Sequence, residues 1–254
     1  MGDEPLEHHL DLLWGRGSAT GRGRPARTTR EQVVAAATAR ADAGGLEELS
    51  MRAVAADLGV GVMSLYTHVE SREGLVALMI DHAFAEITGD LYPRAGEPWR
   101  EAAARQAREL WALYARHPWI LEHGSRLPMG PHVLAMEDAF FAAFLDIGLP
   151  APAVANTAVA LRSLVTGLAR DSTSEQDQTR RTGVGLAEYW SSVNAVFWDR
   201  YFDEERYPAM TRLWYEGGFE GDDVLAEEGI LDRAVGAYLD GIATRVKRDE
   251  AVDG

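Results

Sequence analysis

Residues 59–75 read GVGVMSLYTHVESREGL, a short apolar and aromatic run between two glycines and a polar break. Val62, Leu65 and Val69 are spaced three and four residues apart, so they share one face of a helix. The residues that point away from this face are Met63, Ser64, Thr67 and His68. A helix this short is not stable alone in water, so we expect neighbouring helices to brace it. The stretch therefore predicts a helix with one packed face and one free face.

Capping residues predict helices on both sides of this stretch. Thr28 and Glu31 have the spacing of a capping box, which opens a helix that ends at the glycines 44–45. Ser50 begins a second helix, and Ser71 begins a longer fourth helix. A helix, a tight turn and a short second helix, braced by an earlier helix, form a helix-turn-helix. The leading turn of the short helix is then free to enter the major groove of DNA.

The same region resembles a known family. Residues 50–83, SMRAVAADLGVGVMSLYTHVESREGLVALMIDHA, are similar to the DNA-binding motif of the tetracycline-repressor (TetR) family. The likeness is strongest in Leu-Gly-Val, Leu-Tyr-x-His-Val and the following Arg-x-x-Leu, and it spans residues 28–82. It implies that the positions facing base edges are Gly61, Val62, Met63, Ser64 and Thr67. It also implies that the positions holding phosphates are Ser50, Arg52, Tyr66, His68 and Arg72.

The resemblance carries expectations for the rest of the chain. Family members act as homodimers, with an all-helical C-terminal domain that binds a small molecule and dimerises. At Gly61, Val62 and Met63 the chain departs from the tetracycline repressor itself, because these residues offer few hydrogen bonds to bases. The operator of that repressor therefore does not carry over.

Charge is unevenly distributed along the sequence. The chain of 254 residues has a net charge of −15, yet residues 14–30 contain five arginines and no acidic residue. Residues 1–27 lack sustained periodicity and are expected to form a mostly disordered N-terminal arm. Within it, Arg22 and Arg24 flank a glycine in the Arg-Gly-Arg-Pro core of an AT-hook, which fits a narrow minor groove. The alternative is a solvated basic tail with general phosphate attraction.

Composition limits the other possibilities. Without cysteine the chain has no disulfide, thiolate nucleophile or cysteine-based metal site. His117 and His123 alone do not make a zinc site, so no metal or cofactor is expected. The first residues are acidic, unlike a secretory signal, and the longest uncharged run is too short to cross a bilayer. We therefore expect a cytoplasmic protein with no membrane partner.

Helical periodicity continues to the C-terminus, and no strand pattern appears, so the predicted fold is all-α. We expect a basic arm at 1–27, a helix-turn-helix domain at 28–75, and a helical ligand-binding and dimerisation domain at 76–254. The helices expected in the last domain cover residues 98–116, 131–148, 151–171, 186–202 and 224–246. The polar residues 172–183 are predicted to form a mobile connector.

Aromatic residues between positions 99 and 202 exceed what a slim bundle needs, although most of them are expected to pack in the core. A cavity lined by rings and a few polar groups suits a planar, mostly apolar effector. The Pro-rich segment 117–131 resembles the pocket wall of the family. The candidate ligand-binding residues are Trp111, Tyr114, Trp119, His123, Ser125, Arg126, Met136, Phe140, Phe144, Trp190, Phe197 and Trp198.

These patterns predict a ligand-responsive, dimeric DNA-binding regulator, most simply a repressor released from a palindromic operator. Residues 151–171 and 224–246 are the expected dimer helices. One alternative is an all-helical enzyme using carboxylates such as Glu109, Glu122, Glu137 and Asp138, although none forms a catalytic constellation. The other is an architectural DNA-binding protein without an effector.

Overall fold

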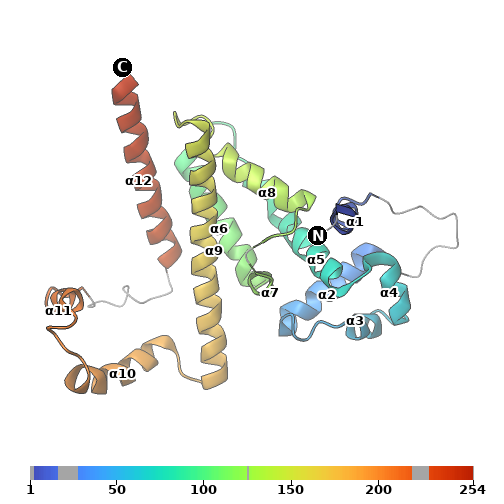
Figure 1. Cartoon of the computed structure of the whole chain (residues 1–254), viewed down its shortest axis with the longest axis horizontal. Helices are drawn as coiled ribbons and strands as arrows, with labels where there is room; N and C mark the ends of the chain where they lie inside the picture. The colour runs from blue at the N-terminus through green and yellow to red at the C-terminus, as the bar shows by residue number, and fades with distance from the viewer. Residues whose placement is uncertain (1–2, 17–27, 125, 219–228, 254) are drawn as a thin grey trace.

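The computed structural model describes residues 3–16, 28–124, 126–218 and 229–253, which form helices and no strands. Figure 1 shows a helix-turn-helix unit of α2 (Arg30–Gly44), α3 (Met51–Asp57) and α4 (Val62–Val69) beside a bundle. The bundle consists of α5 (Arg72–Leu91), α6 (Trp99–Arg116), α8 (Pro131–Ala142), α9 (Ala151–Thr182) and α12 (Ile230–Asp253). The prediction of an all-α fold is confirmed.

Helix α4, the short second helix of the helix-turn-helix, is braced as the sequence predicted. Leu65 and Val69 are fully buried, and Val62 packs against the core from a half-buried position. The turn before α4 contains Gly59 with a φ of 64°, a left-handed conformation that glycine adopts without steric cost. Packing by α2 and α3 therefore stabilises a helix that has only eight residues.

Two of the three predicted caps are confirmed. The hydroxyl of Ser50 accepts a hydrogen bond from the amide of Ala53, and that of Ser71 accepts one from Gly74. The capping box predicted at Thr28 and Glu31 is wrong by one residue, because Thr29 and Gln32 form it. Thr28 is instead buried just before the helix.

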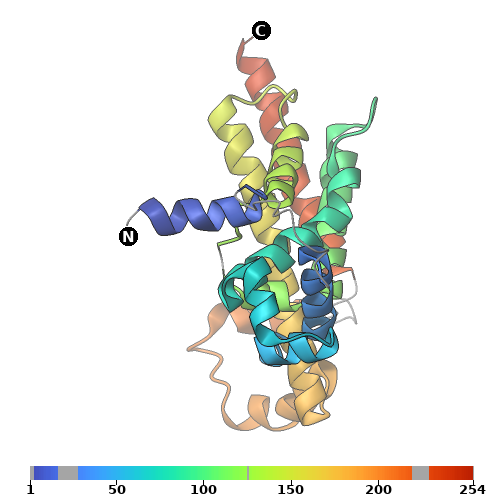
Figure 2. The same ribbon diagram turned by 90° about the vertical axis from the view of Figure 1, so that its right-hand side faces the viewer.

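A helix, α1 (Asp3–Leu13), occupies part of the segment predicted to be a disordered arm. For residues 3–16 that prediction is wrong; residues 17–27, with Arg22 and Arg24, lie outside the described residues. Leu12 and Leu13 are buried, and α1 packs against α5. Tertiary contacts therefore stabilise a helix that is too short to show a clear helical periodicity in the sequence. Figure 2 shows α1 lying crosswise above the helix-turn-helix unit.

The predicted connector at residues 172–183 is also wrong. Helix α9 continues through it to Thr182 and ends where Gly183 adopts a φ of 72°. Side chains one turn apart, such as Thr179 and Glu175, are hydrogen-bonded along this polar half of the helix. Polar composition alone therefore did not distinguish a solvated helix from a loop.

Helices α10 (Leu186–Arg200) and α11 (Pro208–Tyr215) form the α10–α11 extension, residues 186–215, which lies beyond the end of α9 (Figure 1). No described residue in either helix is buried. Its rings contact one another: the ring centroid of Trp198 lies 4.4 Å from that of Phe202 and 4.6 Å from that of Trp214. No helix in the described part of the chain is long and apolar enough to span a bilayer.

An ion pair closes the turn between α5 and α6. Nε and Nη2 of Arg105 lie 2.8 and 2.7 Å from the carboxylate oxygens of Glu97, and both side chains are mostly buried. The amide of Arg94 donates a further hydrogen bond to Glu97. The Arg105 guanidinium, followed by this amide, lowers the pKa of Glu97 to about 2.

We expect Glu97→Gln to lower the free energy of unfolding at neutral pH by about 2 kcal/mol, because Arg105 loses its charged partner. Since the folded-state pKa lies below the ordinary value of 4.5, the stabilisation is present above that pH and is lost as pH falls toward 2. Thermal unfolding of both proteins measures the difference in stability between the variant and wild type, which should be smaller at pH 3 than at pH 7. Asp146→Asn, at an exposed site, is the control; a constant difference at both pH values would contradict the assignment.

Candidate DNA-binding face and effector cavities

The free face of α4 points into solvent. Met63 is 76% exposed, and Gly61, Ser64 and Thr67 are exposed beside it. A hollow of about 330 Å³ adjoins this face, lined by Thr28, Gly59, Val60, Gly61, Ser64, Thr67 and His68. The five residues expected to face bases therefore lie together on the first two turns of α4 and the residue before it, with Val62 half-buried among them.

The residues expected to hold phosphates differ in how exposed their side chains are. Arg52 and Tyr66 are exposed, whereas His68 is half-buried. The Ser50 hydroxyl accepts from the Ala53 amide at 3.2 Å and remains at an exposed helix start, where anions bind well.

Arg72 donates hydrogen bonds to two backbone carbonyls. Its Nε donates to the carbonyl of Leu49 at 3.1 Å and its Nη2 to the carbonyl of Leu46 at 2.7 Å. These bonds tie the loop before α3 to the start of α5. Arg72 therefore serves the fold while its side chain stays exposed, and its contact with phosphate stays a prediction from the sequence.

Two arginines that sequence reasoning did not single out organise the unit. Arg40 on α2 forms a two-pronged pair with Asp57 on α3, with N–O distances of 2.9 and 2.8 Å. Arg30 donates from Nε to the carbonyl of His68, at the end of the recognition helix. No sequence signal marks these pairs, because their partners lie 17 and 38 residues away.

Asp81 joins α5 to the start of α8. It is 5% exposed, and its Oδ1 accepts from the amides of His132 at 2.9 Å and Val133 at 3.1 Å. Its Oδ2 lies 2.9 Å from Nδ1 of His132. Asp81 therefore caps α8 from a neighbouring helix, which a search for local caps does not find.

A second junction links the helix-turn-helix unit to the bundle. Nδ1 of buried His117 lies 2.7 Å from Asp42 on α2, and its Nε2 lies 3.0 Å from Glu86 on α5. Trp119, in the short helix α7 (Trp119–Glu122), donates its indole N–H to Asp42 at 2.6 Å. The junction fixes α2, α5 and α7 to one another.

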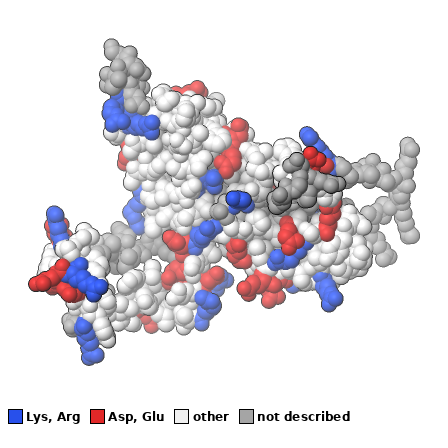
Figure 3. Space-filling model, viewed as in Figure 1, with Lys and Arg blue, Asp and Glu red and all other residues white. Residues whose placement is uncertain are grey.

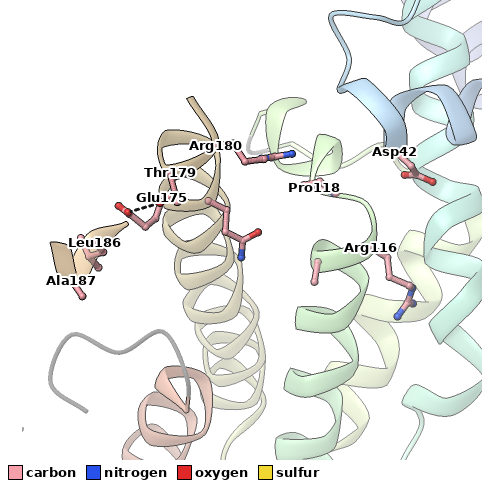
Figure 4. A pocket seen from close by; sticks show the side chains of 10 residues that line it. Asp42, Arg116, Pro118, Glu175, Thr179, Arg180, Leu186 and Ala187 are labelled. Carbon is pink, nitrogen blue, oxygen red and sulfur yellow. Dashed lines mark hydrogen bonds between the residues drawn. The ribbon is translucent and has the colours of Figure 1, made fainter. Parts of the chain in front are cut away.

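Two cavities adjoin this junction. The larger, about 760 Å³, lies between the end of α6, the polar half of α9 and the start of α10. Figure 4 shows its labelled lining, with Asp42 and Arg116 on one side and Glu175, Thr179 and Leu186 on the other. The smaller, about 270 Å³, lies beneath α7 and is lined by Tyr114, Ile120, Leu121, Gly124, Leu127, Arg162, Ser163, Thr166, Gly167 and Arg170.

Most of the predicted ligand residues do not line these cavities. Trp119, Met136, Phe140 and Phe144 are fully buried core residues, and Trp111 is half-buried against the core. Only Tyr114 of the aromatic candidates lines a described cavity, with its hydroxyl 3.2 Å from that of Thr166. The prediction of a cavity walled by many rings is wrong, because rings at helical spacing fill the interior of the bundle.

The remaining candidates are dispersed. Trp190, Phe197 and Trp198 lie on α10, outside the bundle. His123 and Arg126 are exposed, and Ser125 lies outside the described residues. Within the described ranges, no group of three or more His, Asp or Glu side chains is placed to hold a metal.

Three of the four carboxylates considered for an enzyme, all but Glu109, are engaged in structural contacts. Glu122 accepts the amide of Leu46, Glu137 pairs with Arg162 at 2.8 Å, and Asp138 accepts the hydroxyl of Tyr92. Each of these three carboxylates therefore has a separate structural partner.

Comparison with known proteins decides the family. Residues 92–221 match the family described as "Tetracyclin repressor-like, C-terminal domain". The HTH-type transcriptional repressor DrrR1 of Streptomyces coeruleorubidus is 37% identical over 84% of this chain and 78% of its own length. The chain belongs to the TetR family. An HTH-type transcriptional regulator of Saccharopolyspora erythraea is 29% identical over 73% of this chain and 78% of its own length.

Solved TetR-family structures share the fold. Apo ActR of Streptomyces coelicolor has a TM-score of 0.71 at 22% identity, covering 89% of this chain and 99% of ActR. ActR in complex with actinorhodin has a TM-score of 0.69 at 22% identity, covering 85% and 95%. As a TetR-family member, the chain is a helix-turn-helix transcriptional regulator and not an enzyme.

Proposed function

We propose that the chain is a homodimeric repressor that leaves a palindromic operator when a small, largely apolar or aromatic effector binds. The observation that carries the proposal is the exposed face of α4 on a unit fixed to the bundle through α5 and α7. DrrR1 is named a repressor, and ActR was solved with actinorhodin. Both support a repressor that responds to a ligand.

The proposed base contacts come from Gly61, Val62, Met63, Ser64 and Thr67. The proposed phosphate contacts come from Ser50, Arg52, Tyr66, His68 and Arg72. On the face drawn in Figure 3, acidic and basic side chains are interspersed, and neither sign forms a continuous surface. Arg22 and Arg24 remain a sequence-based proposal for minor-groove contact. One recognition helix reads few base pairs, so useful specificity needs two helices about 34–36 Å apart.

Helices α9 and α12 are the proposed dimer surfaces. Ala155, Val159 and Ser163 lie exposed on α9, opposite its buried face, and Ala237 and Gly241 lie exposed on α12. Small side chains let two helices approach closely, and two helices from each subunit complete a four-helix interface.

The cavity beneath α7 is the proposed effector site, because two residues of α7 line it and α7 also carries Trp119, which contacts Asp42 on α2. Tyr114 lies on α6, Ile120 and Leu121 on α7, and Leu127 on the loop before α8. An effector that favours a shifted α7 pulls on the Asp42–His117–Glu86 junction and tilts α5. The two recognition helices then no longer match successive major grooves.

Fluorescence anisotropy with DNA from upstream of the gene tests the proposal. We expect two chains to bind each palindromic site, and a compound that raises the Tm of the free protein to release the DNA. Actinorhodin is a practical first probe in a panel of planar aromatic compounds. Absence of binding to the upstream DNA at low ionic strength would contradict the proposal, as would saturating binding of a stabilising compound with unchanged DNA affinity.

A further inference from the structure

Helix α1 contacts three separate parts of the molecule. Its Leu12 packs against the first turn of α5, so closely that a Cβ added to Gly74 would lie 2.9 Å from the leucine methyl. His8 pairs with Glu70, the residue that follows the recognition helix. After the helix, the indole N–H of Trp14 donates to the carbonyl of Met129 at 2.9 Å. One short helix therefore touches α5, the end of α4 and the loop before α8.

Arg30 joins α1 to the recognition helix. Its Nη1 lies 3.3 Å from the carbonyl of Leu12, and its Nε lies 3.1 Å from the carbonyl of His68. Both carbonyls belong to the last turn of a helix, where intrahelical amide donors run out; that of Leu12 also accepts from the Gly15 amide at 3.4 Å. A cation at two helix C-termini also complements both helix dipoles. The planar guanidinium thus holds the ends of α1 and α4 together.

Trp14 connects the same helix to the effector cavity. Met129 lies in the loop between α7 and α8, and this loop contributes Gly124 and Leu127 to the cavity beneath α7. The contacts run from the cavity loop to Trp14, along α1 to Leu12, and through Arg30 to His68. This route does not pass through α5 or through the His117 junction.

We propose that α1 is a brace that positions the recognition helix relative to the effector loop, with Trp14 and Arg30 as its positioning residues. The proposal rests on the proposed function, since it assigns a second connection between the same two sites. Movement of the loop at Met129 pulls on Trp14, and Arg30 passes the displacement to the end of α4. The recognition helix therefore responds to the loop at its C-terminal end as well as through the tilt of α5.

Two conservative variants test the brace. Trp14→Phe keeps an aromatic ring but removes the indole N–H that donates to the Met129 carbonyl. Arg30→Lys keeps the charge, and hence the general attraction to DNA, but a single ammonium cannot reproduce the fork between two carbonyls. We expect operator affinity to fall about threefold for Trp14→Phe and about tenfold for Arg30→Lys. Trp214→Phe, on the α10–α11 extension with similar exposure, is the matched control.

Hydrogen exchange of the free protein separates positioning from general stability. We expect both variants to speed amide exchange in residues 62–69 and 127–133, with residues 151–171 of α9 unchanged. Operator affinity within twofold of wild type for both variants would overturn the brace, and so would an equal rise in exchange across the whole chain. If the wild type itself does not bind the operator, the proposed function fails instead, whereas the exchange pattern still reports on the brace.

Discussion

Replacing Met63 with glutamate is expected to weaken operator binding by about 100-fold, the largest effect we expect from any single change on the DNA-binding face. The Met63 side chain is 76% exposed and supports no packing, so the substitution leaves the fold intact. In the major groove, however, the carboxylate at position 63 is repelled by the phosphates of the duplex and loses its hydration. Anisotropy titrations over a series of salt concentrations measure the loss, which salt should partly screen.

Leu145→Glu is the matched control, because Leu145 is 60% exposed at the turn between α8 and α9, away from α4. It adds the same charge to the same chain, and its operator affinity should stay within about twofold of wild type. Unaltered far-UV circular dichroism establishes that both variants are folded. If Met63→Glu bound the operator as tightly as Leu145→Glu, α4 would not be the element that enters the groove.

Asp81→Ala is expected to cause the largest loss of stability. Its carboxylate accepts two backbone amides and one imidazole nitrogen at the start of α8, and it is almost fully buried. Alanine leaves these donors without an acceptor, which costs about 3 kcal/mol of unfolding free energy and lowers Tm by roughly 6–12 °C. Differential scanning calorimetry of the free protein measures both quantities.

Asp81→Asn discriminates between the cap and simple packing. The amide oxygen can still accept from one or both backbone amides, whereas its NH₂ group no longer matches the Nδ1–H of His132. Asparagine has nearly the same volume as aspartate. We therefore expect Asp81→Asn to lose less stability than Asp81→Ala. Wild-type stability in both variants would mean that Asp81 does not hold α8.

The helix-turn-helix was predictable because its signals are local. The apolar spacing of Val62, Leu65 and Val69, and the caps at Ser50 and Ser71, lie within a few residues of the structure they specify. The predictions of secondary structure were wrong where tertiary contacts determine whether a segment is helical. Residues 3–13 are helical because Leu12 and Leu13 pack against the molecule.

The site was less predictable than the fold. Aromatic residues such as Phe140 and Phe144 have the same helical spacing whether they fill a core or line a cavity, and here they fill the core. In the junction, His117 lies 75 positions from Asp42 and 31 positions from Glu86 in the sequence. No spacing pattern predicts contacts between residues this far apart. Contacts of this length depend on the tertiary arrangement of helices that are individually predictable.

The exposed rings of the α10–α11 extension have an optical consequence. Three of the chain's seven tryptophans, Trp190, Trp198 and Trp214, lie in the extension, whereas Trp119 is sealed in the core. Indole emission moves to shorter wavelength when water is removed, so any partner that covers the extension shifts the spectrum of the folded protein. Trp14→Phe removes the exposed indole of the N-terminal segment and leaves that signal cleaner. The chain thus carries its own spectroscopic reporter, distinct from the buried chromophore that reports unfolding.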